Sequence, residues 1–123
     1  MQTAYLLIIL TVAGGGQFSA AFSPAPDEAS CLEISKMVGG ILRKSGYEIH
    51  HLGCHRSSQT FSPFEHGAPE NAPRHTYLIE VSGQLVTVTL EKSLEACQQH
   101  LRDRPAAKTS QTWCANSTQK PGG

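Results

Sequence analysis

Four cysteines constrain the fold of this 123-residue chain more than any other feature. In an oxidising compartment, an even number of cysteines in a short chain is typical of a disulfide framework, here two bridges with three possible connectivities. A bridge that closes a loop as long as the one from Cys31 to Cys97 would stabilise the fold by roughly 4 kcal/mol. A small domain gains about a third of its net stability from a bridge of that size. The four residues are Cys31, Cys54, Cys97 and Cys114.

The apolar run near the N-terminus indicates where those cysteines would oxidise. Residues 6–12 read LLIILTV, which is far shorter than the roughly 20 residues of a membrane-spanning helix. Glycines at 14–16 and small residues at 19–21 follow, as in a secretory signal peptide with its cleavage site. We therefore predict a secreted protein without a membrane anchor, consisting of a signal peptide (1–21), a flexible leader (22–30), a core domain (31–104) and a polar tail (105–123).

Charge excludes one broad class of function. The chain has ten basic and ten acidic residues, so its formal net charge is zero. Strong, non-specific binding of nucleic acid needs a basic excess or a basic stripe, and the sequence has neither. The zero net charge also counts against membrane lysis by a basic amphipathic face. We expect a monomer that needs no cofactor.

Hydrophobic spacing predicts one main helix over residues 31–45. Ser30 and Glu33 have the spacing of a capping box, and Gly46 stands where a left-handed residue would end the helix. Apolar residues recur between them at helical intervals and form one stripe, which is expected to face the core: Ile34, Met37, Val38, Ile41 and Leu42.

The remaining segments predict a small antiparallel sheet. The alternating pattern of residues 75–81 and 84–90 indicates a hairpin, with Ser82 and Gly83 in its turn. A short strand (47–52), a long loop (53–74) and a short helix (93–104) complete the core, and no internal repeat is evident. The fold class that we predict is α+β, with one α-helix packed on a twisted antiparallel β-sheet and stabilised by disulfides.

A histidine-rich segment invites comparison with metal sites. His50, His51, Cys54 and His55 lie close together in the sequence, and a spacing of four would place His51 and His55 on one face of a helix. Here the two residues flank Gly53 at a strand end, so we expect solvated loop histidines and no metal site. Cys54 is assigned to a disulfide.

A second set of residues has the chemistry of phosphodiester transfer, which needs a base, an acid and a cation on the phosphate. Its members follow no motif spacing that would fix their geometry, and Glu80 is most simply a solvent-facing strand residue. If the protein is an enzyme, His66, Arg74, His75 and Glu80 are the catalytic candidates. The whole set is Glu65, His66, Arg74, His75, Glu80 and Glu91.

Aromatic residues outside the helix are candidates for a binding surface, because exposed aromatic side chains on loops often anchor interfaces. Tyr77 is better explained as a core residue. Asn116 begins the sequence Asn-Ser-Thr, which is a glycosylation signal in an exported chain. The candidate binding residues are Phe61, Phe64, His66, Arg74 and Trp113.

The order of elements resembles a known family. A helix that runs into Gly46-Tyr47-Glu48-Ile49-His50, a long loop, and a hairpin with YLIEV at 77–81 and GQLVTV at 83–88 are similar to the small secreted guanyl-specific ribonucleases of microbes. They are still more similar to the ribonuclease-like effectors that plant-pathogenic fungi secrete. This resemblance implies one helix against a twisted antiparallel sheet, with an early cysteine bonded to a late one.

The resemblance also implies loss of catalysis. The enzymes have Tyr-Pro-His on the strand after the helix, where this chain has Ser62-Pro63-Phe64, and their last catalytic histidine falls near Glu91. Arg74 could correspond to the phosphate-binding arginine only across a gap. The resemblance thus implies a ribonuclease scaffold without its catalytic groups.

We therefore expect a secreted, non-catalytic effector-like protein that binds a host protein, or RNA, through residues 55–74 and the polar tail. The alternatives are an active secreted ribonuclease and a small secreted toxin or antimicrobial protein. Of the three connectivities, we favour Cys31–Cys97, which would join the two ends of the core, with Cys54–Cys114, which would hold the tail against the long loop.

Overall fold

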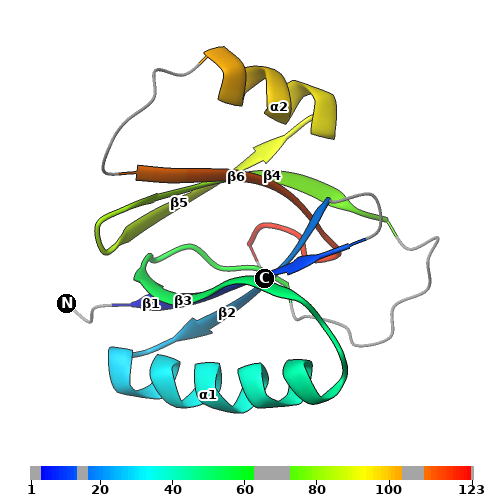
Figure 1. Ribbon diagram of the computed structural model, residues 1–123. Coiled ribbons are helices and arrows are strands. Elements are labelled where there is room, and N and C mark those ends of the chain that lie inside the picture. The colour runs from blue at the N-terminus through cyan, green and yellow to red at the C-terminus, as the bar shows by residue number, and fades with distance from the viewer. Residues whose placement is uncertain (1–3, 14–16, 63–72, 104–109, 123) are drawn as a thin grey trace.

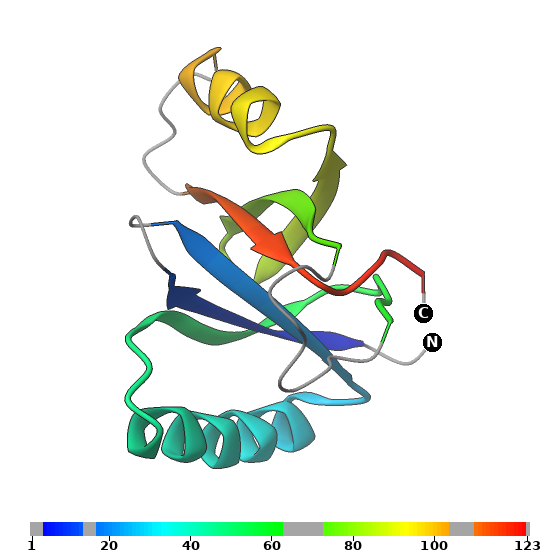
Figure 2. The same cartoon turned by 90° about the vertical axis from the view of Figure 1, so that its right-hand side faces the viewer.

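The computed structural model describes residues 4–13, 17–62, 73–103 and 110–122 of the chain. Within them two helices flank a closed barrel of six strands. The helices lie on opposite sides of the barrel (Figures 1 and 2). The strands are β1 (Tyr5–Val12), β2 (Phe18–Ala25), β3 (Ile49–Arg56), β4 (His75–Ser82), β5 (Leu85–Glu91) and β6 (Ser110–Ser117), and the helices are α1 (Glu28–Lys44) and α2 (Leu94–Asp103).

The barrel consists of two antiparallel sheets of three strands, β2-β1-β3 and β5-β4-β6. Two short parallel contacts close it, one between β2 and β6 and one between β3 and β5. The predicted fold, one helix on an antiparallel sheet, is therefore wrong, because the sheet is mixed and closes on itself. The error arose because the segments that form β1 and β6 were assigned to a signal peptide and to a polar tail.

β1 is the most deeply buried strand. Leu6, Ile8 and Leu10 point into the barrel, whereas Leu7 and Ile9 pack under α1. A strand covered on both faces needs a continuous apolar run, so the LLIIL segment suits this position. The residues predicted as a signal peptide thus supply β1 and the first half of β2 here, and their cleavage stays a prediction. The predicted leader is the end of β2 and the start of α1.

The chain contains two copies of one ββαβ arrangement. The first unit comprises β1, β2, α1 and β3, and the second comprises β4, β5, α2 and β6. In each unit the first strand is central and antiparallel to the other two. Exchanging the units also exchanges the two parallel contacts that close the barrel. The expectation of no internal repeat is wrong, because the repeat lies in the topology and hardly in the sequence.

Both helices begin in the same way. The Asp27 carboxylate caps α1 by accepting a hydrogen bond from the Ser30 N–H at 2.7 Å, and the Ser93 hydroxyl accepts one from the Ala96 N–H at 3.0 Å. Asp27 is therefore the N-cap of α1, and the predicted capping box at Ser30 is wrong. Gly46 has φ +83°, which confirms the left-handed end of this helix.

Only part of the predicted apolar stripe of α1 faces the core. Ile34, Val38 and Leu42 pack against the first sheet, whereas Met37 and Ile41 are 61% and 55% exposed. The predicted hairpin is confirmed, with Gly83 in the turn at φ +60°. The short second helix is confirmed as α2. In the described part of the chain, neither helix has the length and apolar character needed to cross a membrane.

Each disulfide joins the helix of a unit to the third strand of the same unit. The bridges are Cys31–Cys54 and Cys97–Cys114, with Cα atoms 6.1 and 6.0 Å apart. Two bridges are thus confirmed, but the favoured pairing is wrong, because each helix packs on the sheet of its own unit and not across a single core. Loops of 23 and 17 residues correspond to about 3 kcal/mol of stabilisation each.

Peptide mapping of the non-reduced protein should recover these two pairs. Lysine or arginine residues separate all four cysteines, so trypsin places each cysteine in its own peptide. We expect linked peptides that contain Cys31 with Cys54 and Cys97 with Cys114. A double Cys97→Ser/Cys114→Ser variant should lose about 3 kcal/mol of unfolding free energy. A Cys31–Cys97 peptide would contradict the description in two units.

Candidate functional site

Five side chains from three strands meet between β2, β3 and β6. We call them the histidine–aromatic cluster. The His50 ring stacks on Phe18 with centroids 4.4 Å apart, and it is nearly perpendicular to the Trp113 ring, with centroids 6.1 Å apart. The ring centroids of His51 and Trp113 are 4.8 Å apart. The cluster comprises Phe18, His50, His51, His55 and Trp113.

The closest contact in the cluster joins His51 and His55. Their rings are stacked at 5.2 Å and their Nε2 atoms are 2.9 Å apart, within hydrogen-bond distance. Residues at even spacing share one face of a strand, so β3 places both rings on the same side, with Gly53 between them. A Cβ on Gly53 would lie 2.9 Å from the Nε2 of His51 and 3.0 Å from that of His55. The expectation of solvated loop histidines is therefore wrong, because both residues lie on β3 and His55 is only 8% exposed.

A bulge in β3 brings in the third histidine. Leu10 of β1 pairs with His51, but Thr11 pairs with Ile49, so His50 is an extra residue in the ladder. A bulge of this kind re-aims side chains and is frequent beside functional sites. Here it allows the sequential residues His50 and His51 both to contact Trp113.

Burial sets the protonation of the pair. Desolvation is the main cause that lowers the pKa of His51 and of His55 from the ordinary value of 6.5. The charge of His50 lowers the pKa of His51 further, and the charge of His51 does the same for His55. At neutral pH both rings are therefore neutral, and one Nε2–H can donate to the other nitrogen. Protonation of both rings would turn two N–H donors toward each other.

This arrangement predicts acid sensitivity. Below the ordinary histidine pKa of 6.5, the unfolded chain binds protons that the folded pair resists. The folding stability should therefore be constant above that pH and fall as the pH drops below it. We expect the melting temperature to fall between about pH 6.5 and pH 5, and to fall less in His55→Gln. A matched His75→Gln variant on β4 should keep the wild-type profile. A flat wild-type profile would contradict this prediction.

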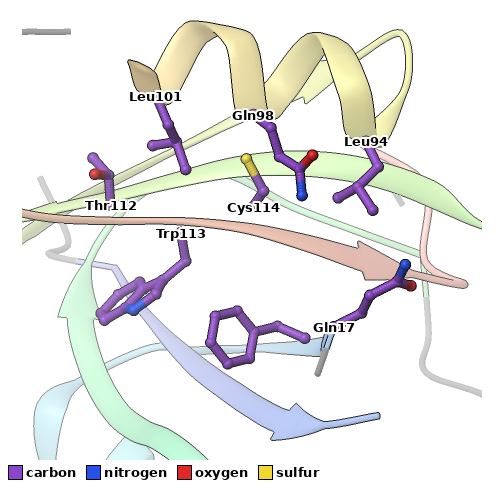
Figure 3. A pocket seen from close by; sticks show the side chains of 8 residues that line it. Gln17, Leu94, Gln98, Leu101, Thr112, Trp113 and Cys114 are labelled. Atoms are coloured by element: carbon purple, nitrogen blue, oxygen red, sulfur yellow. The ribbon is translucent and has the colours of Figure 1, made fainter. Parts of the chain in front are cut away.

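A pocket of about 330 Å³ adjoins the cluster and shares Phe18 and Trp113 with it. We call it the α2 pocket. In Figure 3, Leu94, Gln98 and Leu101 extend from α2 toward β6, while Trp113 and Gln17 lie on the other side of that strand. Among the residues that the structure describes, none of those lining the pocket is charged. The lining residues are Gln17, Phe18, Leu94, Gln98, Leu101, Thr112, Trp113 and Cys114.

The pocket lies along an edge of β6 that the described strands leave mostly unpaired. β4 pairs with β6 over its whole length, from Ser110 to Ser117. On the opposite edge, β2 pairs with β6 only through Ala115 and Asn116. Among the described strands, none pairs with this edge over residues 110–114. A strand edge of this kind presents backbone N–H and C=O groups to an incoming chain.

The candidate catalytic residues that the structure describes are spread along β4 and β5. His75 opens β4, and Glu80 lies five residues further along the same strand, so their side chains point to opposite faces. At the usual strand rise their Cα atoms are about 16 Å apart. Arg74 immediately precedes β4, and Glu91 of β5 accepts from His100 of α2 at 2.7 Å. Glu65 and His66 lie outside the described residues.

The candidate binding residues lie in different parts of the structure. Phe61 is 6% exposed and stacks on Phe22 at 4.3 Å, so it belongs to the core and not to a surface. Trp113 is half-buried and lines the α2 pocket. Phe64 lies outside the described residues. The Asn116 side chain accepts a hydrogen bond from Thr76 at 2.7 Å, and its glycosylation stays a prediction.

Sequence reasoning missed most of this site. The spacing of four between His51 and His55 was interpreted as that of a helix. On a strand, the same spacing also places both side chains on one face. A His-x-Gly-x-His pattern inside a predicted strand could have indicated the pair. Gln17 and Phe18 were assigned to the signal peptide and were therefore not considered.

No group of three or more His, Cys, Asp or Glu side chains in the described ranges is arranged to hold a metal ion. Comparison of the chain with protein-family models, with curated proteins and with solved structures finds no match in any of the three. The geometry of the site is therefore the basis for any functional conclusion.

Proposed function

We propose that this protein is a secreted, non-catalytic binding protein of the effector type, which binds an extended segment of a host protein. The observation that supports this most directly is the α2 pocket beside the open edge of β6. Two disulfides support export, since such bridges persist in oxidising compartments. The separation of His75 and Glu80 on β4 counts against the ribonuclease alternative.

An extended peptide suits this site for two reasons. The edge of β6 over residues 110–114 can hydrogen-bond to the backbone of an added strand, and alternate side chains of that strand would then enter the pocket. The pocket offers aromatic and aliphatic contacts from Phe18, Leu101 and Trp113, with amide groups from Gln17 and Gln98. RNA suits it less, because none of the described residues that line the pocket is a cation that could bind a phosphate.

Selection of random peptides on the oxidised chain tests this proposal. We expect enriched peptides with apolar residues at alternate positions. Trp113 is the single tryptophan of the chain, so occupation of the pocket should change the intrinsic fluorescence. N-methylation of alternate peptide amides should abolish binding, because it removes the backbone hydrogen bonds of an added strand.

Two neighbouring glutamines provide a matched pair of variants. Both Gln98 and Gln99 are exposed on α2, but only Gln98 lines the pocket. Gln98→Arg should weaken peptide binding at least tenfold, about 1.4 kcal/mol, while Gln99→Arg should leave it unchanged. Equal affinity of both variants would contradict the proposed surface. Cleavage of RNA by the same wild-type sample would overturn the non-catalytic assignment.

A further inference from the structure

We propose that α1 is a self-association surface, through which two copies of this chain form an antiparallel dimer about a two-fold axis. The observation that carries the inference is an exposed face of α1, on which apolar residues and a glycine lie between two opposite charges. This surface does not depend on the proposed peptide binding, since α1 and α2 lie on opposite sides of the barrel (Figures 1 and 2). It departs from the monomer that the sequence led us to expect.

The outward face of α1 leaves large apolar side chains exposed. Met37 and Ile41 are one helical turn apart, and they are 61% and 55% exposed. Gly40 lies beside them, and a Cβ built on it would meet no heavy atom within 4 Å. Packed helices approach to about 8–10 Å between their axes, and the absence of a side chain at one position favours such an approach. This face therefore has the apolar contacts and the space that a second helix needs.

Two opposite charges lie at the two ends of this face. Glu33 is in the second turn of α1, and Lys44 is its last residue. Eleven residues correspond to about three helical turns, so both charges lie on the side of Met37. Both side chains are exposed, and in the described part of the chain neither belongs to an ion pair. A helix with an acid at one end and a base at the other is complementary to a reversed copy of itself.

The positions of these residues agree on one axis. The pairs 33 and 44, and 37 and 40, are both centred between residues 38 and 39. A two-fold axis at that point places Glu33 of each copy opposite Lys44 of the other. The same axis places Met37 of each copy beside Gly40 and Ile41 of the other. Every contact is then made twice, as in the isologous interfaces of homodimers. The area is small, so we expect a reversible dimer.

Sedimentation of the oxidised full-length chain, from micromolar to millimolar concentration, tests the proposal. The average mass should rise from one chain toward two. A zero-length carbodiimide should then link the Lys44 Nζ to the Glu33 carboxylate, as mapped by mass spectrometry. Within one chain these residues are about 16 Å apart along α1, too far for this reagent, so the link reports the dimer. A single chain at every concentration would overturn the proposal and leave this face to a different protein. A dimer without the link would contradict the pairing of the two helices.

Charge reversal separates this interface from unspecific association. Lys44→Glu and Glu33→Lys should each weaken dimerisation about tenfold or more, because each places like charges opposite each other on both sides of the axis. The combined Glu33→Lys/Lys44→Glu variant should restore it, since both ion pairs form again with exchanged signs. Arg102→Glu, a matched change in the last turn of α2, should retain wild-type association. A folded double variant that stays monomeric would contradict the antiparallel arrangement.

Gly40→Gln tests the close approach and leaves the charges in place. In the single chain the new side chain has open space, and glutamine is a better helix former than glycine, so the melting temperature should not fall. In the dimer the side chain would occupy the place of Met37 of the second copy. Association should therefore weaken about tenfold or more. Unchanged association of this variant would overturn the proposed packing.

Discussion

A chain that lacks residues 1–21 should fail to fold cooperatively. The deletion removes all of β1, in which five consecutive side chains are buried, and part of β2. Burial of a large aliphatic side chain contributes about 1.5–3 kcal/mol, so this strand contributes on the order of 10 kcal/mol. That is comparable to the whole stability of a small domain, about 5–15 kcal/mol. The five residues are Leu6, Leu7, Ile8, Ile9 and Leu10.

Thermal unfolding of refolded chains 1–123 and 22–123, followed by circular dichroism, measures this effect. A point variant adds a test without truncation: Ile8→Asp places a carboxylate inside the barrel and should abolish cooperative unfolding. Ala13→Asp, at an exposed position just beyond β1, should be tolerated. Refolding in vitro removes any role of the segment in targeting.

The same experiment decides between two interpretations of the N-terminus. A cleaved signal peptide is absent from the mature protein, so residues 5–12 cannot be both removed and central in the barrel. If the chain 22–123 unfolds cooperatively with both disulfides formed, the signal peptide is favoured and the place of β1 is contradicted. If it does not, export has to leave these residues on the chain, and the mass of protein recovered from the medium should include them.

Gln119→Leu should destabilise the protein by about 3–5 kcal/mol, because each buried polar group left unpaired costs about 1–3 kcal/mol. Gln119 is 1% exposed. Its side chain accepts from the Phe22 N–H at 2.7 Å and donates to the carbonyl oxygens of Phe22 at 2.9 Å and of Ser62 at 2.8 Å. Leucine is of similar size, so the change removes these bonds with little change in volume.

The other unit supplies a matched residue. Gln59 forms the corresponding pair of hydrogen bonds with Val88 of β5, donating at 2.7 Å and accepting at 2.9 Å. It is only half-buried, so Gln59→Leu should cost less, about 1–2 kcal/mol. Chemical denaturation of both variants, with Gln99→Leu on the exposed face of α2 as control, measures the difference. A Gln119→Leu chain within about 1 kcal/mol of the wild type would contradict this role of the side chain.

The two glutamines belong to a short sequence pattern that the two units share. Residues 54–59 and 114–119 share the pattern Cys-x-x-Ser-Ser/Thr-Gln, and in both the serine hydroxyl accepts from the glutamine N–H at 3.1 Å. Each glutamine then bonds to a strand of the other unit. The shared pattern covers six residues, which is too short to reveal a repeat without the topology. The second copy moreover lies in a segment whose polar composition predicted a tail.

Local signals were interpreted correctly wherever one residue sets the backbone. Gly46 and Gly83 both adopt positive φ at the predicted helix end and hairpin turn. Errors occurred where one pattern fits two structures. A run such as LLIIL suits a signal peptide and also a strand buried on both faces. The site could not be predicted from the sequence, because Phe18, Trp113 and the histidine pair come from segments that meet only once the barrel closes.

The pairing that closes the barrel is much shorter than the pairing inside each unit. Among the described residues, three pairs are in register across the two parallel contacts, whereas the pairings inside each unit extend over nearly whole strands. Contacts that are local in sequence form fast, so each unit can fold first and the two can associate late. Phe18 belongs both to one of these contacts and to the α2 pocket. A peptide bound there would therefore slow the separation of the two units. A peptide with a longer residence time would then also give the closed barrel a longer lifetime.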